Sequence, residues 1–271
     1  MSWARIMAPL AGGKGDEAVL TAAAALAGPF GAEVAAVHTP ADVADLMPWM
    51  GEGFMGGVQI TAIESLKEAS ATGERAARSA FDACAAKSKT FISLESPVWA
   101  GLSMQGRLSD VVVFDDAAAR GRGPLAEAFQ QIVADEQRPT IVARPGFNAT
   151  GVALVAWDGG KEASRAARTA LPLLQKASRV VIFSAPTATS RKFDPADLQA
   201  FYAARGVAAE VQTGGEGGDA APILLEAASR LGASLLVAGA FGHPRLQEYI
   251  FGGTTRSLLG AENGPSLFLS H

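Results

Sequence analysis

The chain has 271 residues, of which 49% are hydrophobic and 18% charged, and this composition supplies a large core and excludes a disordered chain. Its one cysteine, Cys84, excludes an internal disulfide and indicates a reducing, cytoplasmic setting. The net charge of −4 disfavours nucleic acid partners. The longest apolar stretch, Ala18–Ala27, is shorter than the ~20 residues of a membrane span, which disfavours a membrane partner.

In the first half, short apolar segments alternate with stretches of helical periodicity. Strands are predicted at Ile6–Leu10, Glu33–His38, Thr90–Leu94, Asp110–Phe114 and Thr140–Ala143. Helices are predicted at Asp16–Leu26, Ile60–Lys87 and Pro124–Val133. Alternating strands and helices indicate βαβ units and a parallel sheet, and nearly all-apolar strands indicate that helices cover both faces.

A segment rich in Gly, Met and Pro, residues 39–57, separates the second strand from the second helix. Long loops in compact domains often carry function, so this segment is interpreted either as a lid or interaction surface or as a cover over the sheet edge. It contains a GxGxxG sequence, Gly51–Gly56, but no strand precedes it, as a dinucleotide-binding turn requires.

The segment Pro145–Thr150 breaks the alternation, and we place a domain boundary there, with domains at 1–145 and 151–271. The order of elements then restarts. Strands are predicted at Val152–Trp157, Arg179–Ser184, Val207–Gln212, Ser234–Ala238 and Ser266–Leu269. Helices are predicted at Glu162–Leu174, Asp194–Ala204, Ala220–Leu231 and within 239–259.

The two halves resemble a diverged internal repeat. A Gly-Gly-Lys sequence follows the first strand of each half, at 12–14 and at 159–161. The segments 110–115 and 140–143 of the first half align with 234–239 and 266–269 of the second. Three anchors in the same order favour duplication over two unrelated domains.

The strongest motif of the second half follows its fourth strand and leads into a helix. Closely spaced glycines let a backbone approach a ligand, and the unpaired N–H groups of a helix N-terminus receive phosphate. A plain loop capped by Gly and Thr is the alternative, and His243 either touches phosphate or bonds within the loop. The candidate residues are Gly239, Gly242, His243, Gly252, Gly253, Thr254 and Thr255.

Asp158 and Gly159 follow the first strand of the same half. If the strand order is 3-2-1-4-5, the order reverses between strands one and four, which end at Asp158 and Gly239. Ligands of open parallel sheets bind at such a reversal. Asp158 could accept hydrogen bonds from a ligand amine or hydroxyl, or it could cap the following helix.

The spacing Gly239-x2-Gly242-x9-Gly252, with the segments 155–163, 251–259 and 265–271, resembles the universal stress protein family. The likeness covers residues 152–271 well and 4–144 loosely, so the whole chain is similar to a tandem member. The resemblance implies an α/β fold of two doubly wound parallel five-stranded sheets, adenine nucleotide alpha hydrolase-like, in the order 3-2-1-4-5. It also implies dimers paired through the last strand, here as an intrachain pseudo-dimer with optional further association as a homodimer.

By this resemblance, Asp158 meets the adenosine part of ATP or another adenine nucleotide, with or without Mg²⁺, and the motif glycines line the phosphate path. Gly253 stands where the ATP-binding pattern has Ser or Thr, which removes one hydroxyl contact. In the first half, Ala11 replaces the aspartate and Asp115 takes the place of Gly239. We therefore expect that half to have lost nucleotide binding and to act as a partner domain.

The motif offers no general base or nucleophile, so we expect at most slow ATP hydrolysis. The three histidines have no second ligand at metal-binding spacing, which disfavours a zinc site. The leading hypothesis is a cytoplasmic stress-response sensor or regulator that binds an adenine nucleotide. A nucleotide-free interaction module and an adenylating enzyme are the alternatives.

Overall fold

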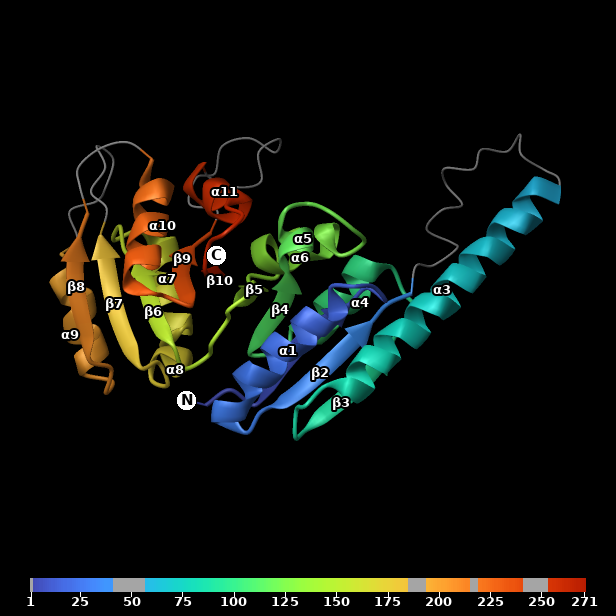
Figure 1. The fold of residues 1–271 in the computed structure, drawn as a ribbon, viewed down its shortest axis with the longest axis horizontal. Helices are drawn as coiled ribbons and strands as arrows, with labels where there is room; N and C mark the ends of the chain where they lie inside the picture. Colours follow the sequence, from blue (N-terminus) through green and yellow to red (C-terminus); the bar gives the residue numbers. More distant parts are fainter. Residues whose placement is uncertain (1, 41–56, 185–193, 215–218, 241–252) are drawn as a thin grey trace.

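The computed structural model describes residues 2–40, 57–184, 194–214, 219–240 and 253–271. Strands and helices alternate along both halves of the chain (Figure 1). The strands of the first half are β1 Arg5–Leu10, β2 Glu33–His38, β3 Lys89–Ser93, β4 Val111–Asp115 and β5 Thr140–Ala143. Those of the second half are β6 Val152–Ala156, β7 Arg179–Ser184, β8 Ala209–Thr213, β9 Leu235–Gly239 and β10 Ser266–Ser270.

All of these strands form one ten-stranded sheet in the order β3-β2-β1-β4-β5-β10-β9-β6-β7-β8. The first half has the predicted order 3-2-1-4-5. The second half has the same order when its strands are counted inward from the opposite edge of the sheet, as β8-β7-β6-β9-β10. Every neighbouring pair within a half is parallel. The α/β fold class and the doubly wound order that the sequence predicts are therefore confirmed.

The two five-stranded sheets are continuous because their last strands pair. β10 runs antiparallel to β5, with Phe268 opposite Ile141 and Leu267 opposite Val142. The intrachain pairing of fifth strands that the sequence predicts is thus present. It covers the edge that each half would otherwise expose, which is where an isolated sheet would pair with another chain.

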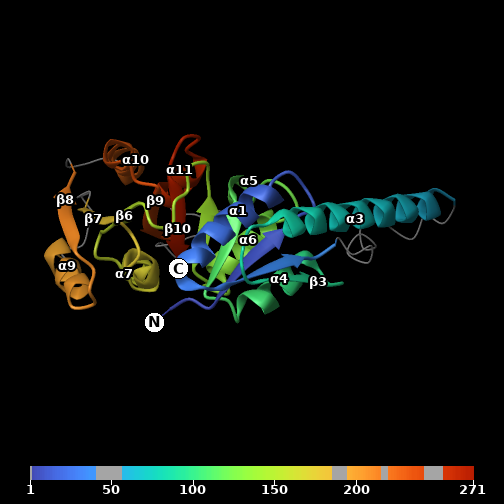
Figure 2. The ribbon, with the colours of Figure 1, turned by 60° about the horizontal axis from the view of Figure 1, so that its bottom comes forward.

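Helices cover both faces of this sheet. One face packs against α1 Asp16–Ala27, α3 Gly57–Ala83, α7 Lys161–Thr169, α8 Leu171–Leu174 and α9 Pro195–Ala203. The other packs against α4 Val98–Gly106, α5 Asp116–Ala119, α6 Ala126–Ala134, α10 Ala220–Leu231 and α11 Gly253–Gly260. In the second half, α10 lies on the opposite side of the strands from α7 and α9 (Figure 2).

The side-chain alternation of the strands separates two apolar cores. In β10, Phe268 faces one core while Leu267 and Leu269 face the other. Trp3 stacks on Phe268 with ring centroids 6.3 Å apart and planes at 4°. The N-terminal segment of the first half therefore packs directly on the last strand of the second.

Apart from shifted ends and the short α5, which the sequence does not predict, two helices differ from those predicted. The helix expected at Glu162–Leu174 is interrupted between Thr169 and Leu171, because Pro172 lacks an N–H and its ring clashes with the preceding turn. Helix α4 was not predicted, since two glycines in nine residues weaken its propensity. Its Gly101 packs closely against Ser96 and Thr39, a tertiary contact that the sequence does not reveal.

None of the helices in the described part of the chain is both long and apolar enough to cross a membrane.

Candidate functional site

The candidate site lies where strand order reverses in the second half, between the adjacent strands β6 and β9. The turn after β6 is built by its own residues. Asp158 Oδ1 accepts a hydrogen bond of 2.7 Å from the Gly160 N–H, and Gly159 has φ of 72°, a left-handed conformation that favours glycine. The carboxylate is exposed, and no residue that the structure describes bonds to its other oxygen.

Gly239, at the end of β9, is required by packing. A β-carbon built on it would lie 2.6 Å from the Ala163 nitrogen and 2.8 Å from the Glu162 β-carbon. Glycine therefore lets the first turn of α7 press against the end of β9. The close approach that the sequence assigns to a ligand is made here by this helix.

Helix α11 starts beside the same strand end. Thr255 is buried, and its hydroxyl donates to the Gly239 carbonyl at 3.4 Å. Thr254 is half-buried in the same turn, and Gly253 is exposed, with no described atom within 4 Å of a β-carbon built on it. Among the described residues, none fills the space in front of Gly253, and Thr255 holds the first turn of α11 next to β9.

Asp158, Gly159, Gly239 and the start of α11 are thus distributed around the reversal point, as the sequence predicts for a crevice. Gly242, His243 and Gly252 lie outside the residues that the structure describes. The binding roles assigned to all of these residues remain predictions.

The equivalent position of the first half is occupied by a side chain of the chain itself. Asp16 is buried, and its carboxylate accepts hydrogen bonds from the N–H groups of Ala11, Gly12 and Gly13 at 2.9, 2.9 and 3.3 Å. Such a set of converging N–H groups is an anion-binding concavity. Burial raises the pKa of Asp16, and these three bonds and nearby His38 oppose that rise.

Helix α3 packs against the same turn after β1. A β-carbon on Gly12 would lie 2.5 Å from the Cα of Gly73, which belongs to α3. Asp115, at the end of β4, caps α5 through a 2.9 Å bond from the Ala118 N–H. A β-carbon on Gly15 would lie 2.5 Å from an oxygen of the Asp115 carboxylate. Two carboxylates and a helix thus fill the space in which an anionic ligand would have to sit.

The end of α11 is held by the first half. Arg144 is buried and donates to the carbonyls of Leu258 and Leu259 at 3.0 Å and of Pro265 at 3.1 Å. Cations and donors near a helix C-terminus satisfy its free carbonyls. The same guanidinium pairs with Asp116 at 2.8 Å. The helix that follows the glycine motif is therefore anchored across the junction of the two halves.

Sequence reasoning missed Asp16, Glu162 and Arg144. Asp16 could have been found, because a small acidic residue that begins a helix just after Gly-Gly-Lys-Gly is placed to bond the preceding turn. Glu162 is buried at the first turn of α7, with Lys161 as its 3.5 Å ion-pair partner. Arg144 has no local signal, since Asp116 is 28 residues away and the carbonyls that it bonds are more than a hundred residues away.

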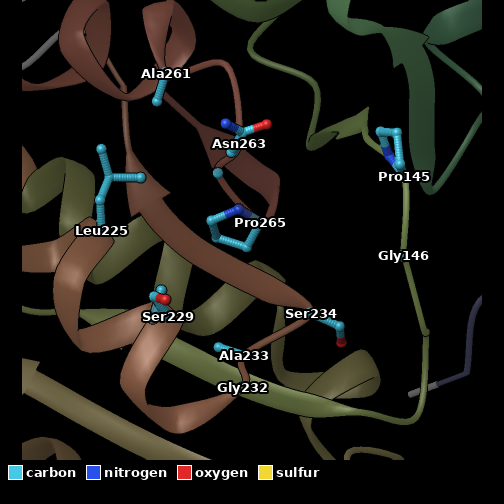
Figure 3. Close-up of a pocket in the computed structure, with 12 residues that line it drawn as sticks. Pro145, Gly146, Leu225, Ser229, Gly232, Ala233, Ser234, Ala261, Asn263 and Pro265 are labelled. Atoms are coloured by element: carbon cyan, nitrogen blue, oxygen red, sulfur yellow. The ribbon is translucent and has the colours of Figure 1, made fainter.

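A cavity of about 430 Å³ lies at the opposite ends of these strands (Figure 3). It is lined by the end of α10, the turn before β10 and the connecting residues Pro145 and Gly146. Its lining carries no charged side chain. Within the described ranges, no three His, Cys, Asp or Glu residues are grouped as a metal site would require.

Two halves of equal strand order, joined through their fifth strands and each with a reversal point, define a tandem α/β protein of the doubly wound class. Residues 151–265 match the model of the Universal stress protein family. The match is confined to the second half of the chain, and this segment is therefore similar to that family. No curated protein matches the sequence.

Three solved structures share the fold over nearly the whole chain. A universal stress protein from Archaeoglobus fulgidus DSM 4304 has 15% identity and a TM-score of 0.66, covering 98% of this chain and 95% of its own. A functionally unknown protein from Pseudomonas aeruginosa PAO1 has 13% identity and a TM-score of 0.58, with coverages of 99% and 92%. A putative universal stress protein from Pseudomonas aeruginosa UCBPP-PA14 has 15% identity and a TM-score of 0.54, with coverages of 99% and 93%.

Proposed function

We propose that this chain is a stress-response sensor or regulator that binds an adenine nucleotide, of the ATP type, in its second half only. The proposal is carried by the contrast between the two reversal points. In the first half, the backbone N–H groups after β1 are occupied by Asp16. In the second half, the corresponding turn uses only one oxygen of the exposed Asp158.

The chemistry of the second site suits the two ends of a nucleotide. The free oxygen of Asp158 can accept a hydrogen bond from a ribose hydroxyl or an amine. The first turn of α11 offers N–H groups and a partial positive charge to a phosphate, and the space at Gly253 admits one. The family match over residues 151–265 supports this assignment.

A nucleotide-free interaction module is the second candidate, and two observations favour it. Gly253 lacks the hydroxyl that the nucleotide-binding pattern of the family supplies, and α7 rather than open space lies against Gly239. In that case the pairing of β5 with β10 makes a rigid scaffold for a protein partner.

Calorimetric titration of the purified chain with Mg-ATP, together with mass spectrometry of any ligand released on denaturation, separates the two candidates. We expect one binding site per chain, lost on Asp158→Ala or Gly252→Val. Asp115→Ala, which removes a carboxylate from the reversal point of the first half, is the matched control and should leave affinity unchanged. A stoichiometry of two, or equal loss in the control, would contradict the assignment to the second half. Absence of binding in the wild type would favour the interaction module.

A further inference from the structure

A second, larger cavity lies between the two halves, away from the reversal points. Its volume is about 590 Å³, and we call it the interdomain pocket. The first half contributes Ser2, Trp3, Asp110 and Pro139. The second half contributes one side of α7, the first two residues of α8, Gln175, and Phe201 and Arg205 from the end of α9 and the turn after it. A molecule bound here would contact both halves at once.

The walls of the interdomain pocket are largely apolar. Trp3 is only 6% exposed and stacks on Phe268, so its position is set by the core. Leu171 and Pro172 of α8 and the half-buried Phe201 of α9 complete this surface. Because these side chains are held by core packing, the pocket is formed without a ligand.

Three arginines surround this apolar surface: Arg165, Arg168 and Arg205. All three are exposed, and none forms an ion pair with a carboxylate in the part of the chain that the structure describes. Arg205 lies over the Phe201 ring at 3.6 Å and donates to the Phe201 carbonyl at 3.0 Å, which fixes its guanidinium.

Local causes account for only part of this cluster. Arg168 lies in the last turn of α7, where a cation is favourable. Arg205 likewise bonds the Phe201 carbonyl in the last turn of α9, but a helix C-terminus does not explain Arg165 on the same cavity, in a chain with a net charge of −4. The one acidic residue of the lining, Asp110, already accepts the backbone N–H groups of Ala4 and Arg5 at 2.7 and 2.9 Å.

We propose that the interdomain pocket binds a small organic anion with an apolar body. The anionic group, a carboxylate, sulfonate or phosphate, pairs with Arg165 and Arg168, whose guanidinium donors match such oxygens bidentately. The apolar body lies against Trp3, Phe201 and α8. Phosphate or sulfate alone would gain only the charged contacts, and a neutral hydrocarbon only the apolar ones.

The test uses the fluorescent probe 8-anilinonaphthalene-1-sulfonate on the full chain. We expect one saturable site, and at least a tenfold loss of affinity in the double variant Arg165→Gln/Arg168→Gln. The neutral analogue N-phenyl-1-naphthylamine and sodium sulfate should each bind at least tenfold more weakly than the sulfonate probe. Excess Mg-ATP should not displace the probe, because the two sites are separate.

The matched control is Arg78→Gln/Arg230→Gln, which removes the same charge from arginines outside this pocket. It should leave probe affinity within twofold of the wild type. Circular dichroism verifies folding, and either single variant, Arg165→Gln or Arg168→Gln, replaces the double variant if that one does not fold. The proposal is overturned if the pocket variants bind the sulfonate probe as tightly as the control does, or if the neutral analogue binds equally well.

Discussion

Gly12 and Gly73 approach so closely that a β-carbon on Gly12 would lie 2.5 Å from the Cα of Gly73. This contact seats α3 on the end of β1 and closes the reversal point of the first half. The contact is asymmetric, because a β-carbon built on Gly73 would lie at least 3.9 Å from every described atom outside its own helix backbone and its chain neighbours. The two glycines are therefore not equivalent, although each contributes to the same contact.

Alanine substitutions at these two positions should have opposite effects. Gly12→Ala introduces both the overlap with α3 and a side chain at φ of 75°, so we expect a loss of about 3 kcal/mol in the free energy of unfolding. Gly73→Ala replaces glycine inside a helix without a clash, so a gain of up to about 1 kcal/mol is expected. Urea denaturation of the two variants measures both values. Equal destabilisation by the two would show that the contact is not as close as described.

The pH dependence of stability should carry a contribution from Asp16. Burial raises the pKa of Asp16 in the folded chain above its ordinary value of 3.8. The folded state therefore holds this proton more tightly than the unfolded state, and the resulting stabilisation is present below pH 3.8 and lost as pH rises through the folded pKa. Relative to Asp16→Asn, the wild type should lose stability as the pH rises from about 3.8, the ordinary pKa, through the raised pKa of the folded state.

Urea denaturation across that pH range, with wild type and variant in parallel, isolates the contribution of this one group. Glu17→Gln is the control, since Glu17 is the exposed neighbour in the same helix turn. A difference between wild type and Asp16→Asn that stays constant with pH would show that the pKa of Asp16 is not raised in the folded chain.

Arg144 should be a principal link between the halves. Arg144→Ala removes the donors to Leu258, Leu259 and Pro265 and leaves buried carbonyls unpaired, so we expect a loss of about 3 kcal/mol in the free energy of unfolding. Lysine should not restore it, because an ammonium lacks the planar fork that reaches these carbonyls and Asp116 together.

The control for Arg144 is Arg107→Ala. Arg107 pairs with Glu136 at 2.6 Å, but its side chain is 64% exposed. An exposed ion pair contributes less than about 1 kcal/mol. Chemical denaturation of the two variants should therefore differ clearly, and equal losses would argue against a buried role for Arg144.

Restoring the missing hydroxyl at position 253 should strengthen nucleotide binding. A side chain at position 253 overlaps no residue that the structure describes, and a serine there would add one hydrogen bond to a phosphate. One such charge-assisted bond corresponds to about a tenfold gain in affinity for Mg-ATP, measured by calorimetry. Gly253→Ala fills the same space without the hydroxyl and should not show the gain. An equal gain in both variants would point to helix stabilisation instead.

The periodicity of the sequence predicts the α/β class and the strands, because apolar β-branched segments and amphipathic segments differ in a purely local property. It also places a turn after the first strand of the second half, but the helix cap considered for Asp158 is wrong, because Gly160 is the N-cap of α7 and Asp158 bonds the Gly160 N–H instead. Family resemblance in the second half adds the strand order, and the internal repeat extends that order to the first half.

Only the tertiary structure decides what lies at each reversal point. The partners of Gly239, Gly12 and Arg144 come from α7, α3 and α11, and sequence spacing carries no information about such distances. A glycine packed against a ligand cannot be distinguished in the sequence from a glycine packed against a helix, because both positions require the absence of a β-carbon. The convergence of Arg165, Arg168 and Arg205 on one cavity likewise depends on the bend at Pro172 and on the way the two halves pack around Trp3.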